Sequence, residues 1–220
     1  MYSRADLEKL AEVIRKGSYL IVCDDIYHKL VYDGERFTSL LAVAPDLADR
    51  VIIINGVSKT YSMTGWRLGY ALGPAKIITA MENIQSQSTS NPTSFVQRAA
   101  AAALTGDQGC VEEMRKVFEG RRNHIVSMLN AIPGVSCGLP KGAFYAFPNV
   151  KGLFGKKTRS GETLTGSMNV ASWLINEARI AVIPGGPFGA DENLRLSYAT
   201  SDAKIEEGLK RFSEAVSKLS

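Results

Sequence analysis

The sequence predicts a layered α/β protein, and three observations support this class. Two short apolar runs, at residues 19–23 and 50–56, have the length and composition of strands buried on both faces of a parallel sheet. A third run, at 66–73, is expected to form another strand. Its glycines lie where two backbones must approach closely. Helical patterns precede and follow these runs, and this alternation is typical of α/β domains.

The first helix is expected directly before the first strand. Ser3 suits its N-cap and Gly17 its C-cap. Between them one apolar stripe repeats at helical spacing, formed by Leu7, Leu10, Val13 and Ile14. The same reasoning predicts further helices at 75–87, 93–106 and 111–132.

The pattern changes in the second half of the chain. Short strands broken by Gly and Pro are expected at 135–150, and two more precede a final helix that begins at Ser201. This part predicts a small α+β domain. We expect a boundary inside the long helix, which divides the chain into a large-domain part at 1–118 and a small domain at 119–220.

The composition excludes several classes of function. The chain has 220 residues, a net charge of +4 and no basic block, which does not favour nucleic acid as a partner. No apolar stretch is long enough for a membrane span. Three widely spaced cysteines and two histidines argue against a disulfide framework and a metal site. A cytoplasmic location is the default expectation.

Polar side chains follow the first two predicted strands. Asp24, Asp25 and Tyr27 come after the first strand, and Ser58 and Lys59 come after the second. Ligands of open α/β sheets bind outside the carboxyl ends of the strands, so these groups are expected to share one crevice. Taken singly, such an acid is more often a loop start or helix cap, and such a lysine is more often a surface residue.

The combination of residues fits one cofactor, pyridoxal 5′-phosphate. The amine of Lys59 can bond to an aldehyde, and Ser58 with Arg67 can hold a phosphate. The carboxylate of Asp24 can pair with a pyridinium nitrogen, and the phenol of Tyr27 can reach the ring hydroxyl.

Several motifs resemble the class I pyridoxal-phosphate aminotransferases. GVSKTYSMTGWRLG resembles the family's cofactor-lysine signature, and VCDDIYHKLVYDG resembles the stretch that holds the ring nitrogen. Four further stretches follow in the family's order: QSQSTSNPTSFVQRAA, GAFYAFPNV, VIPGGPFG and NLRLSYATS. The resemblance implies fold-type I, with Lys59 as Schiff-base lysine and general acid/base. It also implies that Arg195 grips the substrate's alpha-carboxylate, and that Ser90 and Asn91 approach the neighbouring subunit's cofactor in a homodimer.

The resemblance also bears on the substrate and on completeness. QSQSTSNP lacks an arginine and is similar to the branch with aspartate and aspartate/prephenate aminotransferases, so aspartate and 2-oxoglutarate are expected. Aromatic or alanine donors, and lyases on the same fold, remain open. In the family, a helix like the opening one follows an Asn-Pro-Thr-Gly motif, so the chain is expected to lack the N-terminal half. A truncated, non-catalytic domain that needs a partner chain is therefore the alternative.

Overall fold

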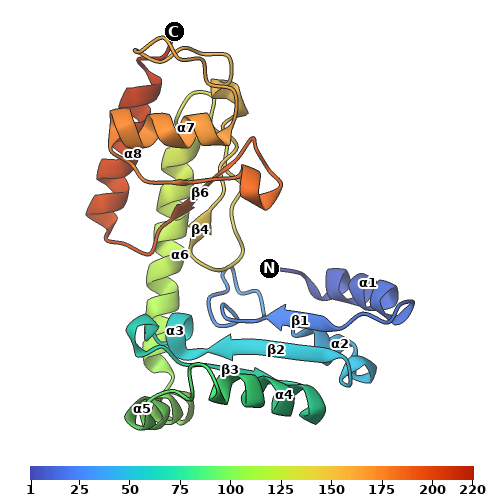
Figure 1. Cartoon of the computed structure of the whole chain (residues 1–220). Coiled ribbons are helices and arrows are strands. Elements are labelled where there is room, and N and C mark those ends of the chain that lie inside the picture. Colours follow the sequence, from blue (N-terminus) through green and yellow to red (C-terminus); the bar gives the residue numbers. More distant parts are fainter. The chain divides into compact units, whose positions relative to one another are not determined.

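A computed structural model describes residues 1–220, which divide into two compact units, Met1–Arg115 and Lys116–Ser220 (Figure 1). The division lies within the long helix α6 (Gly109–Asn130), as does the expected boundary after residue 118. We call the two parts unit 1 and unit 2. Their assignment as large and small domains of an enzyme stays a prediction.

Unit 1 contains a three-stranded sheet in the order β1-β2-β3. Its strands are β1 (Ile21–Asp24), β2 (Val51–Gly56) and β3 (Gly69–Leu72). The first two pair in parallel, as expected, but β3 runs antiparallel to β2. The sequence predicts no direction for the third run, and the structure adds that the sheet is mixed. The chain reverses between β2 and β3 through a one-turn helix and a turn, without a long helix that would cross a face of the sheet.

Strand β1 is less buried than its sequence predicts. It lies at the edge of the sheet, and its Val22 side chain is 62% exposed, whereas Val51 and Ile52 of β2 are buried. The expectation of a strand buried on both faces is therefore wrong for β1. An apolar run indicates that the side chains of a strand are stabilised by burial, but other helices or strands must pack against them to bury them.

The core of unit 1 lies between helices α1 (Arg4–Arg15) and α2 (Leu40–Val43) and the start of β2. The buried members of this core cluster are Leu7, Ala11, Leu40, Ala44, Leu47 and Val51, and unit 1 has further buried apolar residues, among them Leu30 and Val57. Ser3 forms the expected N-cap, because its hydroxyl accepts a hydrogen bond from the Asp6 amide at 3.2 Å.

Two details of α1 differ from expectation. The C-cap is Lys16 rather than Gly17, and two members of the predicted stripe, Leu10 and Val13, are exposed. Only Leu7 and Ala11 of this helix are fully buried, so the helix covers the sheet with a narrower face than its apolar spacing predicts. The other expected helices of unit 1 are present as α4 (Ala75–Ser86) and α5 (Ser94–Thr105).

Unit 2 packs helices around a small antiparallel sheet in the order β4-β6-β5. Its strands are β4 (Tyr145–Ala146), β5 (Ile183–Pro184) and β6 (Leu194–Ser197). The helices, besides the end of α6, are α7 (Ser167–Trp173), a π-helical turn at Leu174–Ala178, and α8 (Asp202–Val216). Ser201 caps α8, as expected for a helix that begins there.

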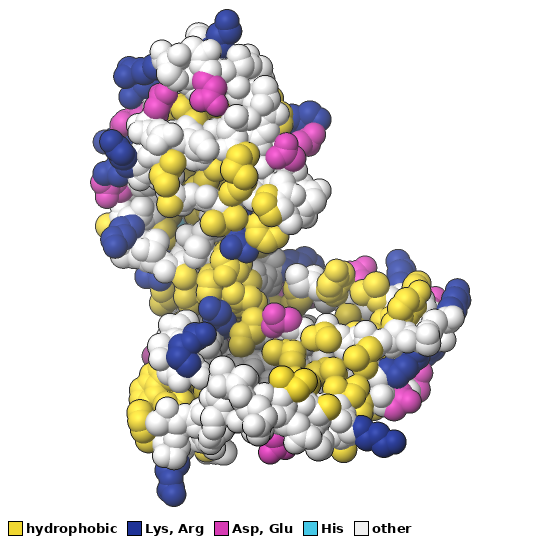
Figure 2. All heavy atoms as spheres, viewed as in Figure 1, with side chains coloured by type: hydrophobic (Ala, Val, Ile, Leu, Met, Phe, Trp, Pro, Cys, Tyr) yellow, Lys and Arg dark blue, Asp and Glu magenta, His cyan; other side chains and the backbone are white.

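The two units differ in how much apolar surface they cover. Figure 2 shows hydrophobic side chains on the visible face of the molecule. The large apolar side chains that are exposed in unit 1 include Tyr19, Leu20, Val22, Leu72 and Ile84. No helix of the chain combines the length and the apolar character that crossing a membrane requires.

Candidate functional site

One edge of the unit 1 sheet collects the polar groups that the sequence singled out. Asp24, the last residue of β1, pairs with Ile54 of β2, and the Asp25 amide donates to the Ile54 carbonyl at 2.9 Å. Because β1 and β2 are parallel, their carboxyl ends lie together. Because β3 is antiparallel, its first residues lie at the same edge, and the Val57 amide donates to the Leu68 carbonyl at 3.4 Å.

Asp24 and Tyr27 stand in the turn that leaves β1. The Asp24 carboxylate is exposed and accepts a hydrogen bond from the Ile26 amide at 3.3 Å, which shapes the turn. Tyr27 is half-buried. The turn thus presents an acid and a phenol beyond the end of the strand.

Ser58 and Lys59 lie on a one-turn helix, α3 (Val57–Thr60), that begins directly after β2. Both side chains are half-buried. Gly56, the last residue of β2, permits this sharp junction, because a Cβ there would lie 2.8 Å from the Leu68 carbonyl oxygen. The strand-to-helix step therefore fixes Lys59 at the sheet edge rather than on a mobile loop.

Arg67 ends the turn that leads into β3. Its backbone is left-handed, with φ of 52°, and its guanidinium donates to the Thr64 carbonyl at 2.8 Å. The side chain is exposed and forms no ion pair. A strained backbone that presents an exposed arginine is typical of a functional site. The hydrogen bond between Val57 and Leu68 joins the residue before Ser58 to the residue after Arg67. The backbones of Ser58 and Arg67 therefore lie close together.

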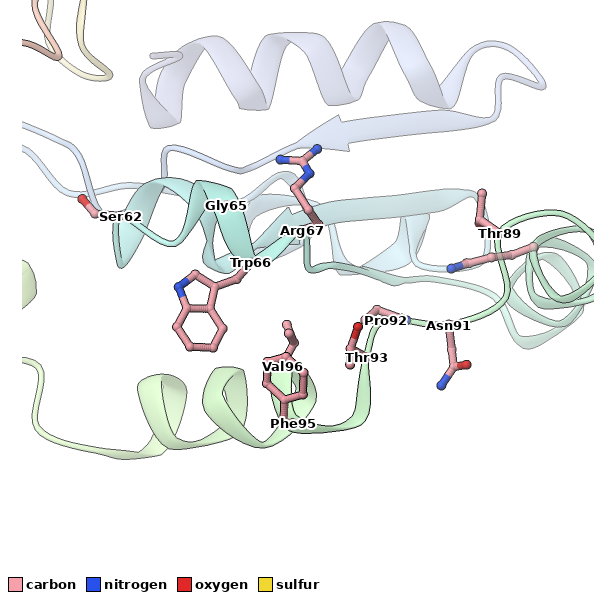
Figure 3. A pocket seen from close by; sticks show the side chains of 11 residues that line it. Ser62, Gly65, Trp66, Arg67, Thr89, Asn91, Pro92, Thr93, Phe95 and Val96 are labelled. Carbon is pink, nitrogen blue, oxygen red and sulfur yellow. The ribbon is translucent and has the colours of Figure 1, made fainter.

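A hollow of about 710 Å³ opens beside Arg67. In Figure 3 the Trp66 ring points toward α5, whereas the Arg67 side chain leaves the turn on the opposite side. The hollow is lined by Ser62, Gly65, Trp66, Arg67, Gln85, Thr89, Asn91, Pro92, Thr93, Phe95 and Val96. Of the predicted site residues it includes Arg67, together with Asn91 of the stretch expected near a neighbouring subunit.

A histidine and an asparagine, both missed by the sequence analysis, join the two strand ends. His28 Nδ1 lies 3.0 Å from the side-chain nitrogen of Asn55, and Asn55 Oδ1 accepts from the Gly56 amide at 2.7 Å. One signal could have found Asn55: it is the single polar side chain inside the otherwise apolar run of β2. His28 gave no such signal.

Burial shifts the pKa values of three groups near this edge. It lowers the pKa of His28, which favours the neutral imidazole, and it raises the pKa of Asp25, with a further rise from the neighbouring Asp24 charge. Burial likewise raises the pKa of Cys23, so this thiol stays protonated. The sheet edge is therefore a partly desolvated environment.

Arg195 lies in unit 2, on β6, whereas the sheet edge described above belongs to unit 1. Its guanidinium is held over two rings, 4.8 Å from the centroid of Tyr145 and 4.7 Å from that of Phe188. It forms no ion pair. Stacking fixes the plane of the guanidinium and leaves its edge available to a carboxylate.

Residues 1–212 match the family described as aminotransferase class I and II, and the chain belongs to this family. It is 44% identical to an aspartate aminotransferase of Rhizobium meliloti over its whole length, and that length is 54% of the relative. It is 45% identical to a probable aspartate/prephenate aminotransferase of Rickettsia bellii, of which it covers 55%. The chain therefore spans about half the length of the curated relatives that it matches.

Solved structures agree on the fold. A crystal structure of the aspartate aminotransferase from Rhizobium meliloti matches with a TM-score of 0.95 and 43% identity, covering 100% of this chain and 55% of that one. An aromatic aminotransferase from Pyrococcus horikoshii matches with a TM-score of 0.86 and 35% identity, covering 99% of this chain and 56% of that one. The fold is thus that of the aspartate aminotransferases, and this chain spans about half the length of those structures.

Proposed function

We propose that the chain carries the cofactor-lysine half of a pyridoxal-phosphate aminotransferase. One observation supports this most: β1, α3 and the start of β3 bring an acid, an amine and an arginine to one sheet edge. These groups are Asp24, Lys59 and Arg67. Asp24 belongs to one motif and Lys59 and Arg67 to a second, separate one, and membership of the aminotransferase family implies the same cofactor.

The chemistry of these groups fits pyridoxal phosphate. Arg67 forms no ion pair and, with the hydroxyl of Ser58 nearby, can bind the phosphate. Asp24 lies at the end of β1 and can hold a proton on the ring nitrogen, while Tyr27 in the same turn can bond the ring hydroxyl. When bound, the cofactor supplies an electron sink that stabilises negative charge at a substrate's alpha carbon.

Lys59 and Arg195 would then divide the work on the substrate. The Lys59 amine would hold the cofactor through its aldehyde and, when free, would accept a proton from the substrate's alpha carbon. Arg195, stacked between two rings, binds the alpha-carboxylate through the free edge of its guanidinium. Arg195 belongs to unit 2 and Lys59 to unit 1.

Aspartate and 2-oxoglutarate are the substrates that we propose. Relatives named aspartate aminotransferase support the amino donor, including one from Geobacillus stearothermophilus at 47% identity. Prephenate is the competing acceptor, because other relatives are named aspartate/prephenate aminotransferases. Action as a homodimer in the cytoplasm stays a prediction.

The proposal is tested by chemical trapping. The 220-residue chain is incubated with pyridoxal phosphate and reduced with borohydride, and the modified lysine is mapped by mass spectrometry. We expect the label on Lys59, no label in Lys59→Arg, and an unchanged result in Lys76→Arg, which removes an exposed lysine of α4. Label spread over surface lysines, and unaffected by Lys59→Arg, would contradict the proposal.

A second candidate is a non-catalytic domain that needs a partner chain. The exposed apolar side chains of unit 1, which include Leu20, Val22 and Ile84, favour it. In that case trapping at Lys59 is weak for the chain alone and rises when a polypeptide matching the first half of the relatives is added. The control is the same incubation without that polypeptide. Only the second candidate predicts that trapping at Lys59 is weaker in the control.

A further inference from the structure

The two strand ends at the site are joined by a side-chain contact for which the proposed function has no role. His28 directly follows Tyr27, and Asn55 lies four residues before Lys59. The backbone pairing between β1 and β2 extends to the Asp25 amide and the Ile54 carbonyl. The His28–Asn55 contact, at 3.0 Å, lies just beyond it.

The surrounding hydrogen bonds determine the direction of this contact. Asn55 Oδ1 accepts from the Gly56 amide at 2.7 Å, so the amide nitrogen of Asn55 must face the imidazole. That nitrogen donates, and His28 Nδ1 accepts. The ring is therefore neutral, with its proton on Nε2.

The environment favours the same state. Asn55 is only 8% exposed, so its amide needs a partner within the protein. The Asp25 carbonyl, 3.1 Å from His28 Nδ1, accepts from the His28 amide at 3.0 Å and keeps a second lone pair, so it is the one neighbour that would favour a proton on Nδ1. Phe37 packs edge-on against the imidazole, with 5.9 Å between ring centroids, and burial lowers the pKa of His28.

We propose that His28 and Asn55 form a positioning pair, which holds Asp24 and Tyr27 at a fixed offset from Lys59. The inference rests on the proposed function, since its purpose is to let one cofactor meet both strand ends at once. The turn after β1 and helix α3 both begin where the β1–β2 pairing ends, so contacts such as this one set their separation. A shift of the turn would move the acid and the phenol away from the amine.

Two substitutions separate positioning from simple packing. His28→Leu keeps an apolar group in contact with Phe37 but removes the acceptor for Asn55. His28→Asn restores an acceptor, because its Oδ1 can take the place of Nδ1. His124→Leu is the matched control, since His124 is the other histidine and lies in unit 2, beside Glu206.

The first measurement needs no cofactor. Nitrogen-15 NMR of the imidazole should show a neutral His28 with its proton on Nε2 at pH 7, and a proton on Nδ1 would overturn the proposal. The amide resonances of Tyr27, Ser58 and Lys59 should shift in His28→Leu and return in His28→Asn. Unchanged resonances in His28→Leu would overturn it as well.

The second measurement is the rate of trapping at Lys59. Misplacement of reacting groups by about 1 Å costs up to about a hundredfold in rate, so we expect His28→Leu to slow trapping about tenfold. His28→Asn should recover most of the rate, and His124→Leu should match the original chain. Equal trapping rates in all variants would reject the positioning pair alone, whereas failure to label Lys59 in the original chain would reject the proposed function.

Discussion

Helices α4 and α8 show how differently the two units use similar apolar patterns. α8 buries five side chains in unit 2: Ile205, Leu209, Phe212, Ala215 and Val216. α4 has no fully buried residue, and its Ile84 is 73% exposed. α8 therefore packs into the core of unit 2, whereas α4 leaves apolar side chains of unit 1 uncovered. Unit 2 also exposes some large apolar side chains, among them Met168 and Phe188.

The contrast has a physical basis in the two sheets. The small sheet of unit 2 lies among α6, α7 and α8, and residues such as Leu194 and Tyr198 are fully buried. In unit 1 the edge strand β1 carries exposed apolar side chains, so hydrophobic stabilisation there is incomplete. We expect the two units to respond differently to comparable substitutions.

The largest expected difference concerns two phenylalanines. Phe212 in α8 is fully buried, so Phe212→Ala should destabilise unit 2 by about 3–5 kcal/mol. Phe95 in α5 is 64% exposed, and Phe95→Ala should change stability by less than about 0.5 kcal/mol. Urea unfolding, followed by hydrogen exchange in each unit, measures both. Equal losses would show that the contrast between the units is wrong.

The N-caps provide a smaller test. Ser3 accepts from the Asp6 amide and Ser201 from the Lys204 amide, so replacing either by Ala should cost about 1 kcal/mol. Because α8 carries a large share of the core of unit 2, faster hydrogen exchange after Ser201→Ala should spread through that unit. After Ser3→Ala we expect it to stay within α1. If faster exchange instead spread through unit 1 after Ser3→Ala and stayed within α8 after Ser201→Ala, the contrast between the two units would be wrong.

The pH dependence of unit 1 should reflect His28. In the unfolded chain this group takes up its proton near pH 6.5, whereas burial lowers its pKa in the folded state. The unfolded state then binds more protons, so stability falls as the pH drops below about 6.5 and levels off below the lowered pKa. His28→Asn should remove this dependence in hydrogen exchange of unit 1. If the stability of this variant still falls as the pH drops, groups other than His28 cause the pH dependence.

Asp25 acts in the opposite sense and at lower pH. Burial raises the pKa of its carboxyl, so the folded state binds more protons there than the unfolded chain does. Its contribution to stability therefore increases as the pH falls through the raised pKa. This gain in stability should appear at a lower pH than the loss of stability that His28 causes.

The last test concerns the exposed edge of unit 1, where self-association should change more than stability. Val22→Lys places a charge on an edge strand and should change stability by less than about 1 kcal/mol while reducing self-association of the chain. Ser213→Lys adds the same charge to the exposed face of α8 and is the control. Light scattering compares the two variants. Equal self-association would show that the apolar edge does not attract other chains.

Much of the fold and of the candidate site could be predicted from local sequence. Ser3 and Ser201 mark helix starts because their hydroxyls cap free amides, and the apolar run of β2 is a strand because its side chains suit a buried sheet. The motifs around Asp24 and Lys59 indicated one crevice, since parallel strands end at one edge. These inferences depend on a few consecutive residues.

The sequence by itself determined where helices and strands form and which side chains bear chemistry, because capping, periodicity and side-chain chemistry are local properties. The tertiary structure decided the antiparallel direction of β3, the exposure of Val22, and the His28–Asn55 contact. It also decided that the Arg195 guanidinium stacks on the rings of Tyr145 and Phe188. Each of these depends on segments distant in the chain, and strand pairing and burial are properties of the packed chain as a whole.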